Sequence, residues 1–310
     1  MLGWLTKRIV SAIISLMMIG VPQEKYQKML DELPGIEQRV VGMDLGGWNL
    51  EKVQSQTSDI THYYYHYPST RPDAPVLLML HGFNTDGRVY FPLKVLADTF
   101  ELIAYNYPEK TSAYTGSIDD FVTIIEDFCR LKGLDTVTLV GNSIGGAIGV
   151  HFTSAAANVT VERLVLLSTT LFGARQEDVE ELRGMADKLL KYPDYKLYYM
   201  LLRGRAILGK LGKTELGENA PREAVAIKHV AWYRQILTAM YDYSGTEDAR
   251  GVQCPVLQLH GTTDKLIPLA SAELVKQYIP QTVFHAVEGT GHSLVHSDGD
   301  TVAAWIRAAL

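Results

Sequence analysis

Residues 140–146 of the chain read VGNSIGG, in which one serine has a glycine two residues away on either side. An apolar run, DTVTLV, precedes the serine, and a segment rich in small residues, IGGAIGVHFTSAAA, starts at Ile144. This order predicts a strand, a tight turn and a helix, with Ser143 on the turn. A strained backbone would expose the serine hydroxyl, and the small residues Gly141 and Gly145 would let strand and helix approach closely. The stretch therefore predicts a nucleophilic serine.

A glycine-rich turn between a strand and a helix can also hold a phosphate group. Turns of that kind carry the spacing G-x-G-x-x-G or the sequence G-K-S/T, and residues 140–146 carry neither. The pattern G-x-S-x-G is weak when it stands alone, so the assignment depends on the partners of the serine.

A nucleophilic serine requires a base, and the base requires an acid that orients it. His292 is the candidate base because it follows the last apolar run, whereas His285 lies inside that run and His296 precedes a predicted helix. Asp264 is the candidate acid because it follows the run PVLQLHG and gives the chain order serine, aspartate, histidine. Three other carboxylates are alternatives whose positions fit this order less well: Glu288, Asp298 and Asp300.

Acyl transfer also requires hydrogen-bond donors for the negative charge that develops on the carbonyl oxygen. The loop in LLMLHGFN, residues 77–84, follows a predicted strand. The expected donors are the backbone N–H of Phe83 and the backbone N–H of Ile144, the residue after the serine. Because both donors are main-chain groups, side-chain identity says little about them, and the Phe83 ring is expected to form a pocket wall as well.

Near-continuous apolar runs of strand length alternate with helical patterns along most of the chain. They predict strands buried on both faces, in a doubly wound, mostly parallel α/β sheet with helices on both faces. The earlier stretch THYYYHYP alternates in polarity and predicts an antiparallel strand. Ligands of parallel sheets bind at the carboxyl ends of strands, where the candidate residues lie. The runs are APVLLMLHG, FELIAYNYP, DTVTLVGNS, VERLVLLST, PVLQLHG and TVFHAVEGTGH.

A long insertion separates the fourth and fifth of these runs, and it exceeds what a single crossover helix needs. We expect a helical cap over residues 170–251, inserted into a core of residues 37–169 and 252–310, with an N-terminal apolar and helical extension over residues 1–36. Apolar and aromatic residues recur at near-helical spacing in the cap, which either reflects ordinary helix packing or forms an apolar ceiling over a substrate. The candidate pocket residues are Asn84, Tyr195, Tyr199 and Tyr233.

The N-terminus carries a hydrophobic stretch, because Lys7 and Arg8 precede an uncharged segment from Ile9 to Val21. A spanning helix requires about 20 apolar residues, which is more than this segment supplies. A signal peptide fits the basic start but lacks a small-x-small cleavage site, and a retained helix would rest on a membrane surface or pack on its own protein. The protein would be membrane-associated or exported if residues 1–21 act as an anchor or signal, and cytoplasmic otherwise.

Composition argues against several other classes of partner. The formal net charge is -6 and no long Lys/Arg run occurs, which argues against nucleic acid. Cys129 and Cys254 form no CxxC pair, so neither a zinc site nor a disulfide framework is predicted. Nine histidines are present without an HExxH motif, and His62 and His66 are expected to be surface residues of one strand face. We predict no metal and no cofactor.

The motifs HGF, GNSIGG, HGTTD and GTGH occur in this order at the ends of apolar runs, and with them the chain resembles the α/β-hydrolase superfamily from about residue 70 onwards. It is similar to the capped serine esterases and lipases of the bacterial Moraxella-type lipase group, and to the meta-cleavage-product hydrolases that cut carbon–carbon bonds. The resemblance implies Ser143 as nucleophile, His292 as base and Asp264 as acid, without a cofactor. Where relatives carry D-x-x-G-x-G-x-S, this chain reads YNYPEKTSAYTGS, so the shape of that loop cannot be carried over.

Three functions are compatible with these residues. The first is a serine hydrolase that cleaves carboxylic esters with a hydrophobic acyl or alcohol part, because the apolar cap and N-terminus favour a greasy small-molecule ester. The second is carbon–carbon bond hydrolysis with the same three residues. Its substrates carry carboxylates, so it predicts a pocket arginine among Arg130, Arg203, Arg205 and Arg234. The third is a catalytically idle hydrolase fold that serves as a receptor or scaffold.

Overall fold

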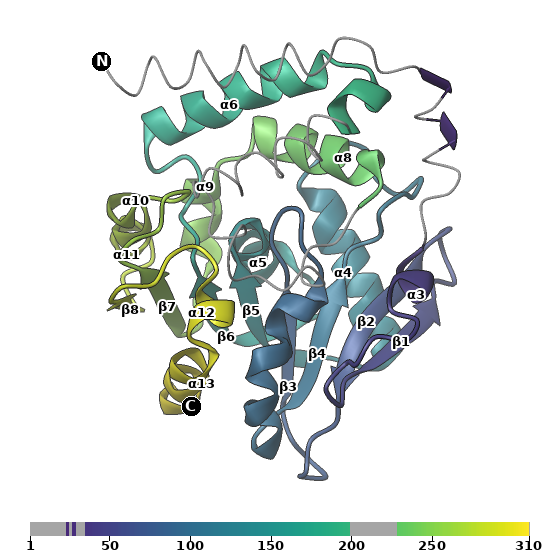
Figure 1. The fold of residues 1–310 in the computed structure, drawn as a ribbon. Coiled ribbons are helices and arrows are strands. Elements are labelled where there is room, and N and C mark those ends of the chain that lie inside the picture. The colour runs from purple at the N-terminus through teal and green to yellow at the C-terminus, as the bar shows by residue number, and fades with distance from the viewer. Residues whose placement is uncertain (1–22, 25–26, 29–34, 199–227, 310) are drawn as a thin grey trace.

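A single mostly parallel sheet runs through the protein, whose structure, a computed structural model, describes residues 23–24, 27–28, 35–198 and 228–309. Within these residues eight strands are arranged in the order β1-β2-β4-β3-β5-β6-β7-β8 (Figure 1). β1 pairs antiparallel with β2 and β2 pairs antiparallel with β4, while the remaining neighbours are parallel. The predicted fold class and the antiparallel strand in THYYYHYP are therefore confirmed. The strands are β1 Asn49–Gln54, β2 Thr61–Tyr67, β3 Val76–Leu80, β4 Glu101–Asn106, β5 Thr136–Asn142, β6 Thr160–Leu167, β7 Val256–Gly261 and β8 Thr282–Val287.

Helices cover both faces of this sheet, and each face has its own hydrophobic core. Along β5, Leu139 packs into one core and Val140 into the other, because successive strand residues point to opposite faces. The first core contains side chains from α4 (Asp119–Lys132) and α5 (Ile144–Ala155), and the second contains side chains from η1 (Gly87–Asp98). Burial on both faces explains the continuous apolar sequence of central strands such as β3, VLLML. The second core also takes side chains from α12 (Leu294–Ser297) and α13 (Gly299–Ala308).

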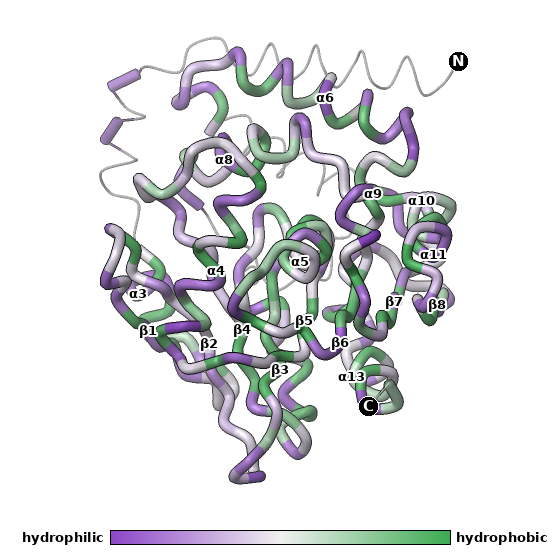
Figure 2. The backbone as a smooth tube through the Cα atoms, turned by 180° about the vertical axis from the view of Figure 1, so that it is seen from behind, coloured by the Kyte–Doolittle hydropathy of each residue, from purple (hydrophilic) through white to green (hydrophobic). Residues whose placement is uncertain are grey.

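The segment between β6 and β7 supplies helices that lie beyond the carboxyl ends of the strands (Figure 1). In this β6–β7 segment, α6 (Gln176–Leu190) packs against α8 (Val230–Tyr241), and the chain returns to the core through α9 (Gly245–Asp248) and η4 (Ala249–Gly251). Hydrophilic and hydrophobic residues alternate along α6 (Figure 2), as expected of a helix with one packed face. The other short helices are α3 Ile36–Arg39, α10 Leu269–Glu273 and α11 Val275–Tyr278.

Two sequence-based predictions concern membrane contact and the N-terminal extension. The hydrophobic stretch over residues 1–21 lies outside the described residues. Among the helices that the structure does describe, none has both the length and the hydrophobicity that a membrane crossing demands.

A buried histidine joins three helices of the first core and makes the stability of the fold depend on pH. His151 of α5 lies between Asp119 of α4 and Asp248 of α9, with its Nε2 2.8 Å from Asp119 Oδ1 and its Nδ1 2.8 Å from Asp248 Oδ2. Burial by itself lowers the pKa of His151, but the hydrogen bonds and charges of Asp248 and Asp119 outweigh it, so that the pKa is raised. The protonated imidazole donates to both carboxylates.

The stabilisation from His151 is expected to be complete below the unfolded pKa of about 6.5 and to disappear as the pH rises through the higher folded pKa. Urea unfolding between pH 6 and pH 9 should therefore show that His151 adds a falling component to the pH dependence of the free energy of unfolding of the wild type. The His151→Gln variant should lack this part of the slope. Equal slopes for the two proteins would contradict the assignment.

Candidate active site

Ser143 lies on a sharp turn between β5 and α5, as the sequence predicted. Its backbone has φ 54° and ψ -123°, a conformation that costs free energy for any residue other than glycine. The turn is fixed on both sides, because Ser143 N donates to Leu167 O at 2.9 Å and Gly146 N donates to Ser143 O at 2.9 Å. The hydroxyl consequently sits at the start of α5, at the carboxyl end of the central strand.

The glycines of this turn are required because the backbones of strand and helix nearly touch. A Cβ atom on Gly141 would lie 2.4 Å from Gly145 O, and a Cβ atom on Gly145 would lie 2.2 Å from Leu80 O. Real Cβ atoms essentially never come so close to another atom, so any side chain at either position would displace the backbone of β3 or α5. This steric requirement accounts for the G-x-S-x-G spacing.

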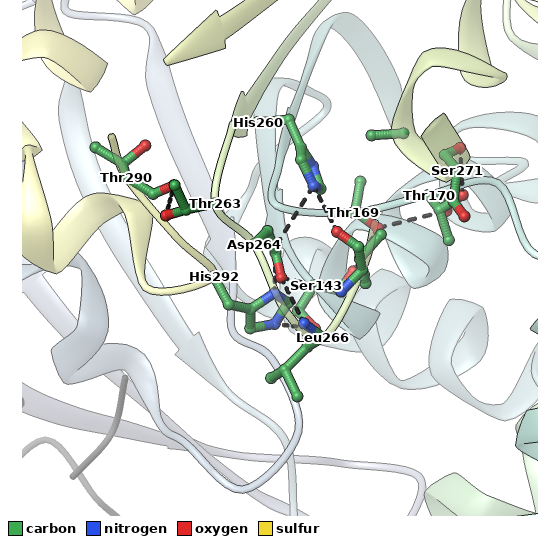
Figure 3. A network of polar contacts seen from close by, with 12 residues as sticks. Ser143, Thr169, Thr170, His260, Thr263, Asp264, Leu266, Ser271, Thr290 and His292 are labelled. Carbon is green, nitrogen blue, oxygen red and sulfur yellow. Dashed lines mark hydrogen bonds and ion pairs between the residues drawn. The ribbon is translucent and has the colours of Figure 1, made fainter. Parts of the chain in front are cut away.

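His292 connects Ser143 to Asp264 in a continuous line of hydrogen bonds (Figure 3). His292 Nε2 lies 3.0 Å from Ser143 Oγ, and His292 Nδ1 lies 2.8 Å from Asp264 Oδ2. Because an ionised carboxylate can only accept, Nδ1 carries the proton, and Nε2 is left to accept from the serine hydroxyl. The structure thus brings together the three residues that the sequence singled out, from the loops that follow β5, β7 and β8.

The carboxylate of Asp264 is held in one orientation by the turn that contains it. Its side chain is fully buried, and Oδ1 accepts from the backbone N–H groups of Leu266 at 2.8 Å and Ile267 at 2.9 Å. Burial by itself raises the pKa of Asp264, but the hydrogen bond and charge of His292, together with the two backbone donors, outweigh it and lower the pKa. Asp264 is therefore ionised at neutral pH.

His260, a neighbour of Asp264, was missed by the sequence reasoning. It is fully buried in β7, and its Nε2 lies 2.9 Å from Ile267 O and 3.4 Å from Asp264 Oδ2. Burial lowers its pKa, so the ring is neutral at neutral pH. Since a carbonyl oxygen only accepts, Nε2 must carry the proton and point into the Asp264 turn. The only sequence signal was its position immediately before the turn, within HGTTD.

The competing histidine in the last strand is engaged elsewhere. The His285 ring in β8 stacks on the Trp305 ring of α13 with their centroids 3.6 Å apart. The hydrogen bond to Ser143 Oγ comes instead from His292, in the loop that follows β8.

The loop expected to bind a negatively charged oxygen adjoins the serine directly. A Cβ atom on Gly82 would lie 3.1 Å from Ser143 Cβ, so this glycine lets the loop after β3 pack against the turn. Ile144 is the first residue of α5, whose N-terminus carries unpaired N–H groups and a partial positive charge. Phe83 follows Gly82, and its ring contacts the Tyr233 ring edge-on, with the centroids 5.3 Å apart.

The candidate pocket residues fall into three groups. Asn84 and Tyr233 are together, because the Tyr233 hydroxyl donates to Asn84 Oδ1 and thereby ties α8 to the loop after β3. Tyr195 is half-buried in the β6–β7 segment, with Lys196 Nζ 6.0 Å from its ring centroid. Tyr199 lies outside the described residues.

One carboxylate holds the end of the loop YNYPEKTSAYTGS. Asp120 at the start of α4 accepts from the backbone N–H groups of Thr115, Gly116 and Ser117 at 2.7 to 3.2 Å. The same carboxylate accepts from Gln235 Nε2 of α8 at 3.0 Å. The loop and α8 are therefore connected through Asp120.

The expectation that His62 and His66 are surface residues is wrong for His62. His62 is fully buried, with its Nδ1 2.8 Å from the Tyr105 hydroxyl and its Nε2 3.0 Å from Asp127 Oδ2. It is buried because its face of β2 packs under α4. His66 is partly exposed and contacts Glu51 and Glu101. Within the described ranges, no three or more His, Cys, Asp or Glu side chains are grouped so that they could hold a metal ion.

Comparison with known families identifies the class of protein to which this fold and the arrangement around Ser143 belong. Residues 75–298 match the family described as alpha/beta hydrolase fold, and the chain belongs to that family. It is 23% identical over 239 residues to monoacylglycerol lipase abhd6-A of Xenopus laevis, covering 71% of this chain and 70% of the relative. It is 25% identical over 198 residues to 2-hydroxy-6-oxo-2,4-heptadienoate hydrolase of Pseudomonas putida, covering 62% of this chain and 70% of the relative.

One solved structure with the same fold aligns with the chain over its whole length. A bacterial membrane phospholipase A superimposes with a TM-score of 0.65 at 17% identity, covering 100% of this chain and 98% of the other. At this identity the likeness concerns the fold. The family assignment identifies the protein as an α/β hydrolase with esterases and lipases among its relatives.

Proposed function

We propose that this protein is a serine hydrolase that cleaves carboxylic esters with a hydrophobic acyl or alcohol part, through an acyl-enzyme intermediate. The observation that carries the proposal is the line of hydrogen bonds from Asp264 through His292 to Ser143 Oγ. In this line a neutral imidazole accepts from a hydroxyl while an ionised carboxylate fixes its tautomer, which is the requirement for activating a serine.

The proposed reaction has two halves. Ser143 Oγ attacks the ester carbonyl carbon while His292 Nε2 takes the hydroxyl proton, and the carbonyl oxygen becomes negatively charged next to the backbone N–H groups of Phe83 and Ile144. His292 then gives the proton to the leaving alcohol. A water molecule attacks the acyl-enzyme while His292 takes its proton. The bond between the acyl carbon and Ser143 Oγ then breaks, His292 returns the proton to Oγ, and the acid is released. The imidazolium that forms in each half is stabilised by Asp264.

The preference for a hydrophobic ester rests on the surroundings of the site. The half-buried Phe83 ring lies in the loop after β3 and packs against the buried Tyr233 ring of α8. We propose residues 170–251 as a cap over the carboxyl ends of the strands, inserted between core residues 37–169 and 252–310. Membrane-surface contact through residues 1–21 would bring lipid-like esters to the site. Support comes from the monoacylglycerol lipase among the relatives.

A fluorophosphonate probe tests the serine mechanism directly, because phosphonylation requires an activated hydroxyl. We expect labelling of the wild type at Ser143, identified by peptide mass spectrometry, and none of the Ser143→Ala variant. Rates on p-nitrophenyl esters of increasing acyl length should then rise from acetate towards longer chains. A wild-type protein that the probe does not label would favour the receptor or scaffold hypothesis instead. A rate that is highest on acetate would refute the hydrophobic preference.

Carbon–carbon bond hydrolysis remains the second candidate, and it is favoured by the similarity to the heptadienoate hydrolase. It requires a cation for the substrate carboxylate. Arg234 is engaged by Asp194 and by the carbonyl oxygens of Leu190 and Tyr192, and Arg130 pairs with Asp127 at 2.6 Å. The other two arginines, Arg203 and Arg205, lie outside the described residues. Turnover of a 2-hydroxy-6-oxo-dienoate faster than of p-nitrophenyl esters would favour this candidate.

A further inference from the structure

A lysine is buried against the loop that adjoins the candidate nucleophile. Lys228, two residues before α8, is 1% exposed. Its Nζ lies 3.3 Å from His81 Nε2, and it lies 4.7 Å from the centroid of the Trp232 ring. Lysines are almost never fully buried unless they are paired, so this position calls for a physical reason.

The direction of the hydrogen bonds around His81 follows from its partners. His81 Nδ1 lies 2.8 Å from Gly82 O, and a carbonyl oxygen can only accept, so Nδ1 carries the ring proton. Burial, and next the charge of Lys228, hold the pKa of His81 well below its usual value, so the ring is neutral. Nε2 is therefore unprotonated and accepts from Lys228. The two hydrogen bonds therefore run in series: Lys228 donates to the His81 ring, and the ring donates to Gly82 O.

This series of hydrogen bonds ends on the peptide group whose N–H is the proposed donor to the oxyanion. The carbonyl of Gly82 and the N–H of Phe83 belong to one peptide unit. A hydrogen bond to its oxygen makes its N–H a stronger donor, since hydrogen bonds in series polarise one another. Gly82 O accepts a second hydrogen bond, from Thr85 Oγ1 at 3.1 Å. Both donors also fix the orientation of this peptide beside Ser143.

The charges around Lys228 keep the lysine cationic at neutral pH. Burial lowers the pKa of Lys228 to about 8, with the carboxylates of Glu109 and Asp86 opposing the shift and Arg39 and Arg88 adding to it. Those four groups are themselves paired, Arg39 with Glu109 and Arg88 with Asp86. Lys228 is thus a buried cation that donates to the His81 ring.

We propose that Lys228 is a positioning residue for the oxyanion-binding loop, acting through the His81 ring on the Gly82–Phe83 peptide. The inference rests on the proposed serine mechanism and adds to it a role for a residue of the β6–β7 segment. Lys228 strengthens and orients the Phe83 N–H in the transition state, when the substrate oxygen becomes negatively charged. It contributes little to binding of the neutral ester, so its loss lowers kcat and leaves KM nearly unchanged.

The test compares Lys228→Met, which keeps the length and apolar volume of the side chain, with the wild type. Loss of an entire oxyanion donor costs 10² to 10³ in kcat, and for this indirect effect we expect a decrease of about 10-fold on p-nitrophenyl butyrate. An alkyl trifluoromethyl ketone, which forms a tetrahedral oxyanion on the serine, should bind weaker by the same factor. A variant with wild-type kcat and ketone affinity, or one in which only KM rises, overturns the proposal.

Lys132→Met is the matched control. Lys132 Nζ donates to the Tyr64 hydroxyl at 2.7 Å and lies 4.9 Å from the Tyr64 ring centroid, so it makes the same two kinds of contact as Lys228. It is at the C-terminal end of α4, away from the carboxyl ends of the strands. Its replacement should leave kcat and ketone affinity unchanged. A decrease equal to that in Lys228→Met would show that lysine removal acts through general stability and would overturn the proposal.

Two further variants test whether Lys228 acts through His81 and keep the test valid if Lys228→Met does not fold. His81→Phe keeps the ring between Tyr107 and Trp232 but removes both nitrogens, so adding Lys228→Met to it should cause no further decrease in kcat. Additive decreases would refute the route through His81. If methionine prevents folding at position 228, Lys228→Gln supplies a neutral donor, and its kcat and ketone affinity should both fall below wild type in parallel. Unchanged values in Lys228→Gln overturn the proposal.

These experiments distinguish a failure of the proposed serine mechanism from a failure of the role proposed for Lys228. A wild-type protein that a fluorophosphonate does not label overturns the serine mechanism, and the role of Lys228 with it. A labelled and active wild type, combined with an unaffected Lys228 variant, overturns the role of Lys228 alone.

Discussion

Replacing Ser143 with alanine is expected to lower kcat about 10⁶-fold on p-nitrophenyl esters, because the variant has no nucleophile to form the acyl-enzyme. The remaining rate would come from the oxyanion donors and from substrate positioning, which together still accelerate hydrolysis over water by about 10³ to 10⁴. KM should change much less than kcat. Steady-state kinetics with enzyme concentrations high enough to detect the residual rate would measure the effect.

Ser297→Ala is the control for this substitution. Ser297 is an exposed serine of α12 whose hydroxyl donates to Ser293 O at 3.0 Å, and its loss should leave kcat unchanged. If Ser143→Ala retained more than a hundredth of the wild-type rate while remaining folded by circular dichroism, the nucleophile would have to be sought elsewhere.

Replacing Asp264 with asparagine is expected to lower kcat about 10⁴-fold without unfolding the protein. Because two backbone N–H groups point at the Oδ1 position, the asparagine must place its carbonyl oxygen there. Its NH₂ group then occupies the Oδ2 position and faces His292 Nδ1. The ring would have to carry its proton on Nε2, where it can no longer accept from Ser143. The pH dependence of kcat should show whether the small remaining activity recovers at high pH.

Asp298→Asn is the matched control for Asp264→Asn. Asp298 was an alternative acid by sequence, and in the structure it precedes α13. Its replacement should change kcat by less than about 3-fold, because Asp298 takes no part in the hydrogen bonds from Asp264 through His292 to Ser143. A large loss of kcat in Asp298→Asn together with a small loss in Asp264→Asn would reverse the assignment of the acid.

The sequence was sufficient to predict the sheet, and to bring Ser143, Asp264 and His292 together, for one physical reason. A parallel sheet places the carboxyl ends of its strands at one edge, so polar residues that each follow an apolar run must converge. Ser143, Asp264 and His292 each follow such a run, although 149 residues separate the first from the last. The steric contact of Gly145 with Leu80 explains why the turn was recognisable.

Other features depend on packing that leaves no periodic signal in the sequence. His62 was expected at the surface, on the same strand face as His66, but α4 covers this face at His62. Lys228 and His81 are 147 residues apart, and nothing in either local pattern indicates that they meet. The backbone of residues 115–117 is likewise held by hydrogen bonds to the Asp120 carboxylate, and no turn motif in the sequence predicts them.

Three contacts made by residues 228–235, just before and within α8, have a consequence for protein engineering. Lys228 contacts His81 and Tyr233 contacts Asn84, so both reach the loop after β3. Gln235 contacts Asp120, which holds residues 115–117. A chimaera in which residues 228–235 are exchanged for those of a relative would lose all three contacts at once. Grafting a foreign β6–β7 segment to obtain a new substrate range is therefore expected to slow turnover too, unless these three side chains are carried over with the graft.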